Sequence, residues 1–200
     1  MKLRTILAAF SAASIAAASQ AQEQGDFSAG IGFSTFGPSL AVEFDAAPNF
    51  GVRGILMGGF SVSDEFQEEG YSIDASIDLG GLALLADYYP FAGTWRVSGG
   101  VFFSNTNVAA DFVADSVADP DFSGELALKN ETAPMITTGF SRPITDSWSI
   151  SSDLGVIISP IEASSTDADP DVQDEVGILN DAFDDVPVYP YASTAIIFRF

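Results

Sequence analysis

The feature of this sequence that most constrains its fold is a period of two. Apolar side chains alternate with small or polar ones through most of the chain. In the segment 27–34, Phe27, Ala29, Ile31 and Phe33 share one side, and serine and glycine residues share the other. Successive side chains of a β-strand point to opposite sides, so this alternation is typical of a strand with one apolar face. The pattern therefore predicts an all-β protein.

The same alternation recurs along the chain. It predicts eight strands, at about residues 27–34, 40–45, 51–62, 71–89, 95–104, 133–142, 148–158 and 188–200. Within the fourth segment the alternation changes phase at Gly80–Gly81, which predicts a β-bulge there. An even number of antiparallel strands is typical of bacterial outer-membrane barrels.

The predicted connections differ in length on the two sides of the sheet. The short turns are Asp45–Phe50, Pro90–Thr94 and Pro143–Ser147, and the long acidic connections are Ser61–Ser72, Asn105–Glu131 and Ser159–Pro187. The last of these includes a short helix, predicted from Pro170 to Asp185 by its apolar spacing and flanking prolines. Outer-membrane barrels place short turns on the periplasmic side. We therefore predict an eight-stranded antiparallel up-and-down transmembrane β-barrel with short periplasmic turns, long acidic outer loops and one short loop helix.

The first 21 residues have the features of a secretory signal peptide. Lys2 and Arg4 precede an apolar run, Ile6–Ala18, and small residues precede Gln22. A retained membrane anchor is the alternative, although the apolar run is too short to span a bilayer. We expect a signal peptide at 1–21 and a barrel domain at 22–200, exported through the periplasm to the bacterial outer membrane.

The balance of charge and apolarity excludes several classes of protein. The chain has 28 acidic and 7 basic residues, yet 47% of its residues are hydrophobic. This hydrophobicity excludes disorder for most of the chain, and the shortage of basic residues argues against nucleic-acid binding. The chain has no Cys, so it has no disulfide or thiolate metal site. After the leader no run of about 20 apolar residues follows, so a closed barrel is the remaining way to cross a membrane.

Aromatic residues cluster next to the short turns, and one ends the chain. Those beside the turns are Phe50, Tyr88, Tyr89, Phe91, Trp95, Phe140 and Trp148. Aromatic residues at one level predict a girdle at the membrane interface, and chance clustering of core aromatics is the alternative. The final strand ends in Phe200. This ending resembles the signal by which the outer-membrane assembly machinery recognises its clients.

The whole mature chain resembles the small eight-stranded outer-membrane barrels, of the OmpA transmembrane domain and OmpX type. Within them it is similar to an uncharacterised proteobacterial outer-membrane protein family. The matching stretches are Gly51-Val52-Arg53-Gly54, Asp87-Tyr88-Tyr89-Pro90-Phe91, and an acidic helix leading into Tyr189-Pro190 and the terminal strand. These motifs are structural, so the resemblance implies a fold and a location but no catalytic residue.

Charged residues also follow the period of two. By parity an inward-facing set includes Glu43, Asp74 and Asp78. It also includes the residues predicted to form an ion-pair layer in the lumen near the short turns: Arg53, Arg96, Arg199, Asp45, Asp87 and Asp153. An eight-stranded barrel is just wide enough for side chains to fill. We expect a satisfied plug, and an ion- or proton-conducting path is the alternative.

The long connections contain 19 of the 28 acidic residues and a single base, Lys129. Solvation explains this composition, and divalent-cation binding is the sharper hypothesis. Ca or Mg at these loops would bridge to lipopolysaccharide phosphates. The candidate cation loop is Asp167-x-Asp169-x-Asp171, which lacks the glycine and the closing glutamate of an EF-hand. No cofactor or dedicated metal site is expected.

The chain contains no His, which removes imidazole-dependent nucleophilic and metal chemistry. Asp78, Asp87 and Asp153 are the inward carboxylates available for acid–base catalysis, and nothing in their spacing demands it. We therefore predict a non-enzymatic structural or surface-interaction protein embedded among outer-membrane lipid and lipopolysaccharide. A narrow channel or carrier for small cationic or apolar solutes is one alternative. A soluble lipocalin-like barrel, with the two faces reversed, is another.

Overall fold

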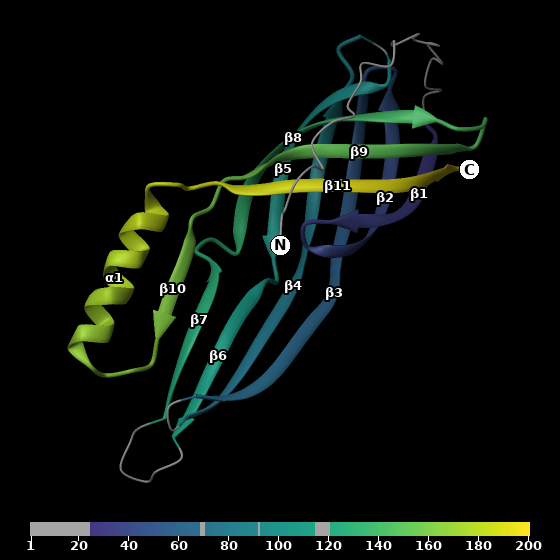
Figure 1. The fold of residues 1–200 in the computed structure, drawn as a ribbon. Coiled ribbons are helices and arrows are strands. Elements are labelled where there is room, and N and C mark those ends of the chain that lie inside the picture. The colour runs from purple at the N-terminus through teal and green to yellow at the C-terminus, as the bar shows by residue number, and fades with distance from the viewer. Residues whose placement is uncertain (1–24, 69–70, 92, 115–120) are drawn as a thin grey trace, which may run out of the picture.

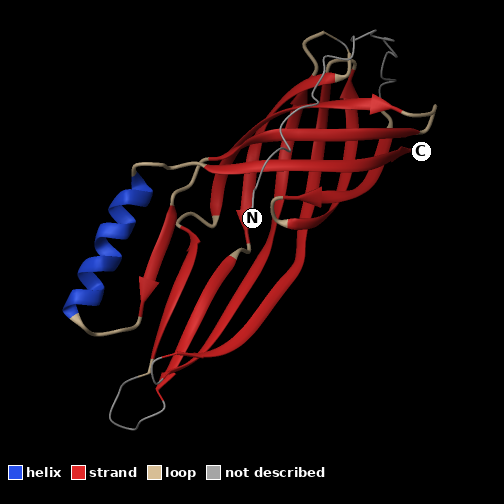
Figure 2. Ribbon diagram, viewed as in Figure 1, coloured by secondary structure: helices blue, strands red, loops and turns tan. Residues whose placement is uncertain are grey.

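The protein is an all-β molecule with one helix (Figure 2). The computed structural model describes residues 25–68, 71–91, 93–114 and 121–200, so the predicted signal peptide lies outside it. The elements are β1 (Phe27–Ser34), β2 (Gly37–Ala47), β3 (Phe50–Glu68), β4 (Tyr71–Tyr88), β5 (Trp95–Ser104), β6 (Asn107–Ala114), β7 (Phe122–Leu128), β8 (Thr132–Pro143), β9 (Trp148–Ile157), β10 (Ile161–Ser165), α1 (Pro170–Asp184) and β11 (Tyr189–Arg199).

Eight of these strands close into an antiparallel barrel. Around the wall the order is β1, β2, β3, β4, β5, β8, β9 and β11, and β11 pairs with β1 to complete the ring. The closing pair runs from Ser28 opposite Arg199 to Ser34 opposite Ser193. The predicted eight-stranded up-and-down barrel is therefore confirmed. Closure also satisfies the backbone of every wall strand along both of its edges.

The predicted long acidic loops are wrong in detail, because they contain ordered strands. β3 and β4 continue past the barrel wall and join β6, β7 and β10 in a sheet that we call the outer lobe (Figure 1). Acidic residues dominate these segments, so they look like solvated loops. Their alternation, as in Phe60, Val62 and Phe66 on β3, nevertheless continues the strand pattern.

A β-bulge marks the junction between barrel and outer lobe. Met57 pairs with Gly81 and Phe60 with Leu79, so Gly58 and Gly59 of β3 together oppose Gly80. Gly58 and Gly59 have φ values of 141° and 83°, a region that side-chain-bearing residues rarely adopt. The bulge predicted at Gly80–Gly81 thus lies on the partner strand, because a phase change in β4 alone does not show which strand carries the extra residue.

The outer face of the barrel is apolar. Ile31, Phe33, Leu56 and Leu154 are each more than half exposed, whereas their strand neighbours turn inward. At the short-turn end each barrel strand contributes one aromatic, and these fall in directly opposed pairs: Phe27 with Phe44, Phe50 with Tyr88, Trp95 with Phe140, and Trp148 with Phe198.

The sequence predicted aromatic residues at this level, and five of the seven it named belong to the ring: Phe50, Tyr88, Trp95, Phe140 and Trp148. Phe27, Phe44 and Phe198 complete the ring and were not predicted, whereas Phe91 lies in the turn after β4. Tyr89 is only 4% exposed and faces the interior, because it follows the last residue of β4 by one position and so has the opposite parity. Trp95 and Trp148 are 42% and 46% exposed, which contradicts the reversed faces of a soluble barrel.

Helix α1 lies beside β10 (Figure 1). Its start at Pro170 agrees with the sequence prediction, and Asp169 caps it by accepting a hydrogen bond from the Asp171 N–H. Asn180 bonds both the N–H and the C=O of Ala163, at 2.7 and 2.9 Å. The helix therefore covers the free edge of β10.

At the last residue of the helix, Asp184, both carboxylate oxygens accept from Lys129 Nζ, each at 2.9 Å. That hydrogen bond raises the pKa of Lys129 above its ordinary value and ties the end of α1 to the lobe. Among the described residues, no helix is long and apolar enough to span a membrane.

Candidate functional site

The lumen contains a buried network of two arginines and two aspartates. Arg53 of β3 bonds Asp153 of β9 at 2.7 Å and Asp87 of β4 at 3.1 Å. Arg96 of β5 bonds Asp153 at 2.7 Å and lies 4.0 Å from Asp87. All four side chains are at most 3% exposed. Four strands thus contribute one member each, which is possible because the barrel turns alternate residues of every strand to a common axis.

Two serine hydroxyls extend this network. Arg53 Nη2 donates to Ser98 Oγ at 3.3 Å, and Arg96 Nη2 donates to Ser151 Oγ at 2.7 Å. Arg53 Nε and Arg96 Nη1 have no hydrogen-bond partner among the described protein atoms. Next to Arg53 and Asp153 a cavity of about 10 Å³ remains, close to the smallest space that holds one water molecule. At this level the lumen is filled.

The desolvation of four charges is costly, and only close pairing offsets it. The two positive and two negative charges balance, and Asp153 accepts from both arginines. Removing one member would leave an opposite charge buried without compensation, which costs more than the intact network contributes. The arrangement can hold four strands in register, and it leaves neither carboxylate free of an arginine.

An apolar plug fills the lumen nearer the outer lobe. Phe36, Phe102, Met135 and Ile157 are all fully buried. Phe36 belongs to the short β1–β2 connection, and its ring lies 4.8 Å from that of Phe102 and 5.3 Å from that of Tyr189. The first outer connection therefore folds into the barrel. The ionic network and the apolar plug together occupy successive levels of the interior.

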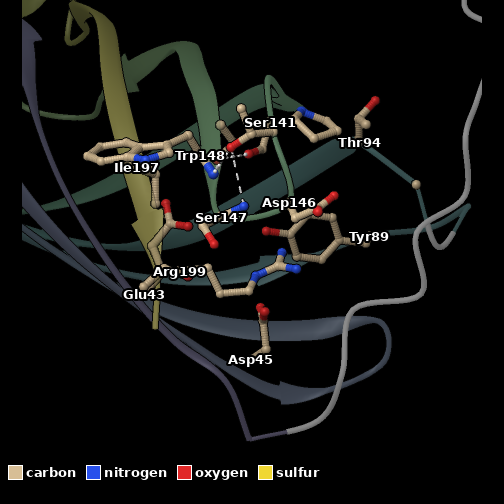
Figure 3. Close-up of a pocket in the computed structure, with 15 residues that line it drawn as sticks. Glu43, Asp45, Tyr89, Thr94, Ser141, Asp146, Ser147, Trp148, Ile197 and Arg199 are labelled. Carbon is tan, nitrogen blue, oxygen red and sulfur yellow. Dashed lines mark hydrogen bonds between the residues drawn. The ribbon is translucent and has the colours of Figure 1, made fainter.

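Arg199 and Asp45 lie apart from the network. None of the four ion-pair contacts of the network includes them. They line a pocket of about 70 Å³ at the short-turn mouth, together with Glu43 and Tyr89 (Figure 3). In the close-up the Arg199 guanidinium lies between Asp45 and the ring of Tyr89. Strand stagger explains the separation, because parity gives the face of a residue but not its height along the barrel axis.

Asp74 and Asp78 do not face the lumen. Both are exposed on the outer lobe, where Asp78 pairs with Asn107 and Asp74 with Asp111 of β6. The expectation was wrong because only residues 81–88 of β4 belong to the barrel wall. Residues 71–78 pair with β6 in the outer lobe, where the even-numbered side chains do not face the lumen. Of the three carboxylates considered for acid–base chemistry, Asp87 and Asp153 remain in the lumen, both paired with arginine.

The candidate cation loop has a local role in the chain. Asp169 is the cap of α1, and Asp167 accepts a hydrogen bond from the Asp169 N–H at 2.9 Å. Across the described ranges, no group of three or more acidic, Cys or His side chains is placed to hold a metal ion. Asp167, Asp169 and Asp171 are therefore not brought together as a ligand set.

Sequence reasoning missed two parts of the interior. Ser98 lies two residues after Arg96, and Ser151 two residues before Asp153, so each serine points to the same side of its strand as the charged residue. The alternation could therefore have predicted that both serines face the lumen. Phe36 lies in a turn, where no alternation exists, and its burial depends on the turn folding inward. Its only signal was an aromatic residue in an otherwise small and polar connection.

Comparison with known proteins finds likeness in structure and not in sequence. No protein-family model and no curated protein matches this chain. The crystal structure of Acinetobacter baumannii CarO superposes with a TM-score of 0.61 at 20% identity, over 86% of this chain and 97% of that one. The crystal structure of A. baumannii CarO2 gives a TM-score of 0.61 at 18% identity, over 89% of this chain and all of that one. These neighbours share the fold of this chain.

Proposed function

We propose that this protein is an outer-membrane surface protein, in which a closed barrel serves as the anchor and the outer lobe as the interacting part. The filled lumen carries this proposal. The ionic network of Arg53, Asp87, Arg96 and Asp153 lies below an apolar plug that includes Phe36 and Phe102. Such an interior supports a structural role over a conducting one.

The apolar exterior supports a membrane location. A soluble protein rarely exposes apolar area on this scale, whereas a barrel wall in hydrocarbon must do so. The ring of aromatic pairs lies at the short-turn end, where aromatic residues meet the lipid headgroups of an outer-membrane barrel. The outer lobe then projects on the opposite, extracellular side.

The chemistry of the interior supports a role without catalysis. The chain has no His and no Cys. The lumen carboxylates Asp87 and Asp153 are held by arginines, so neither is available as a general acid or base in this arrangement.

The competing function is a narrow channel, and electrical recording separates the two. Purified protein inserted into planar bilayers should give no steady single-channel steps, because the ionic network and the plug both block the lumen. Insertion is checked separately in vesicles of the same lipid, by protection of the barrel strands from added protease. Reproducible current steps from inserted wild-type protein would reject the anchor proposal in favour of the channel.

A further inference from the structure

The two edges of the outer lobe are treated differently by the fold. On one side, α1 covers β10, and Asn180 occupies the backbone N–H and C=O of Ala163. On the other side, β3 pairs with β2 only as far as Met57, and its outer half pairs with β4 alone. Within the described chain, the segment 60–67 thus has no strand on its second side, and Figure 1 places it at the margin of the lobe.

The hydrogen-bonding groups of this open edge can be assigned by parity. The C=O of Gly80 accepts from the Asn105 N–H and its N–H donates to Thr106, so even residues of β4 face β6. Odd residues of outer β4 then bond to their partners on β3, which are the even residues from Phe60 to Phe66. The N–H and C=O groups of Ser61, Ser63, Glu65 and Gln67 therefore point away from the sheet.

The open edge lacks most of the devices that usually protect one. Residues 61–67 are all exposed and contain no proline, lysine or arginine. The one protected donor is the Glu65 N–H, which donates to Asp64 Oδ1 at 3.0 Å. An exposed side chain of this kind is readily displaced by a pairing strand. The edge is a template for strand addition, the binding mode in which an extended peptide extends a sheet.

The side chains beside the edge specify the chemistry of an added strand. One face of outer β3 is mostly apolar, with Phe60, Val62 and Phe66. On the other face Glu65 is directly opposite Asp74, which is directly opposite Asp111. Like charges placed opposite one another destabilise a sheet. A basic side chain next to Glu65 would therefore reduce the repulsion within this row of carboxylates. Lys129 is the one basic residue in the segments that build the lobe.

A second copy of the chain does not satisfy this edge. Parallel pairing in register would place Asp64 and Glu65 against themselves. Antiparallel pairing would place the two barrels at opposite ends of a shared sheet, because β3 runs unbroken from barrel to lobe, and one membrane cannot hold both. We propose that the outer β3 edge binds an extended peptide segment of alternating apolar and basic residues as an additional strand. This inference deepens the surface-interaction role and rests on it.

The test uses the whole protein in detergent micelles, where lumen conductance has no influence. The probe is a fluorescent eight-residue peptide of alternating Lys and Val, with an alternating Glu and Val peptide as charge control. Wild-type protein should bind the Lys peptide and not the Glu peptide. Hydrogen exchange of segment 60–67 should slow on binding, because edge amides become paired.

Two variants and one control separate strand addition from simple charge attraction. Ser63→Pro removes an edge N–H without touching the β4 ladder, and should weaken binding about tenfold. Glu65→Gln should weaken it severalfold. Glu162→Gln removes an exposed charge from the same face at the far edge, and should change nothing. Equal binding by wild type and Ser63→Pro would leave only surface electrostatics and overturn the proposal. Absence of binding, or dimerisation through β3, would overturn it as well.

Discussion

At the scale of single residues, the two lumen carboxylates are not equivalent. Asp153 accepts short bonds of 2.7 Å from both Arg53 and Arg96. Asp87 makes one contact of 3.1 Å and one of 4.0 Å. Asp153 is therefore the residue on which the charge balance of the network depends most.

Replacing Asp153 by Ala should lower the free energy of unfolding by about 3–5 kcal/mol, because two guanidinium groups lose their shared partner in a buried site. Asp87→Ala should lower it by less. Both are measured by denaturant unfolding of the protein folded into lipid vesicles. Glu125→Gln, at an exposed position of β7, is the matched control and should change stability by less than about 0.5 kcal/mol. Equal losses at Asp87 and Asp153 would contradict the central place given to Asp153.

At the residue level, alternation alone gives the face on which each charged residue lies. Arg53, Asp87, Arg96 and Asp153 are inward by parity, and the structure places all four in the lumen. Arg199 shares their face but lies at the mouth. The pairing of strands fixes the height of each residue, and that pairing depends on the closed barrel rather than on any one strand.

At the scale of elements, α1 is an edge cover more than a packed core helix. None of its residues is fully buried, and its apolar residues Val172, Val176 and Phe183 are half-buried. Its specific attachments are the two-bond contact of Asn180 with the β10 backbone, the bonds from Gln173 to the Ser165 and Asp167 carbonyls, and the Lys129–Asp184 ion pair. Hydrogen bonds to a strand edge thus contribute to holding this helix in place, in addition to its partly buried apolar side chains.

Replacing Asn180 by Ala should release α1 from β10 while the barrel stays intact. Two hydrogen bonds are lost, and the freed edge groups of Ala163 become open to solvent, so local stability should fall by about 1–3 kcal/mol. The measurement is hydrogen exchange, which should speed up in 161–184 and stay unchanged in the wall strands. Asp174→Ala, at an exposed helix position, serves as the control. Unchanged protection of β10 in the Asn180 variant would show that other contacts hold the helix.

At the scale of the whole molecule, the barrel and the lobe use the same strands differently. In the wall the apolar side chains face outward and the interior is partly ionic. The side of β4 that faces the lumen in the barrel continues into the outer lobe as an apolar sheet face with Ile73 and Ile77. The side that faces outward in the barrel becomes acidic in the lobe. This change of polarity occurs at the glycine bulge. In the proposed membrane location, the apolar band of the barrel wall, about 25 Å tall in such proteins, would end there and water would begin.

The aromatic ring gives a whole-molecule test of membrane insertion. In vesicles, the fluorescence of Trp95 and Trp148 should be quenched most by lipids brominated close to the headgroup. Quenching by chain-terminal bromine should be weaker, because both side chains lie at one rim of the barrel. The single variant Trp95→Phe assigns the remaining signal to Trp148. Strong quenching by aqueous iodide with no effect of brominated lipid would instead favour a water-soluble barrel.

The sequence by itself determined the strand count of the barrel and the face on which each residue of a wall strand lies. A period of two needs only the local geometry of a strand, and it is written in consecutive residues such as those of 27–34. It also located α1, whose cap and first-turn proline are local signals.

Only the tertiary structure decided which charges meet, which connection plugs the lumen and where the wall ends. Asp153 reaches Arg53 across a hundred positions of sequence, and Phe36 is buried because the barrel mouth receives its turn. The acidic segments form a lobe because β5 pairs with β4 only as far as Gly81. The same edge of β4 then pairs with β6 over residues 71–78. These outcomes depend on strand stagger and on neighbours distant in sequence, which no local pattern encodes.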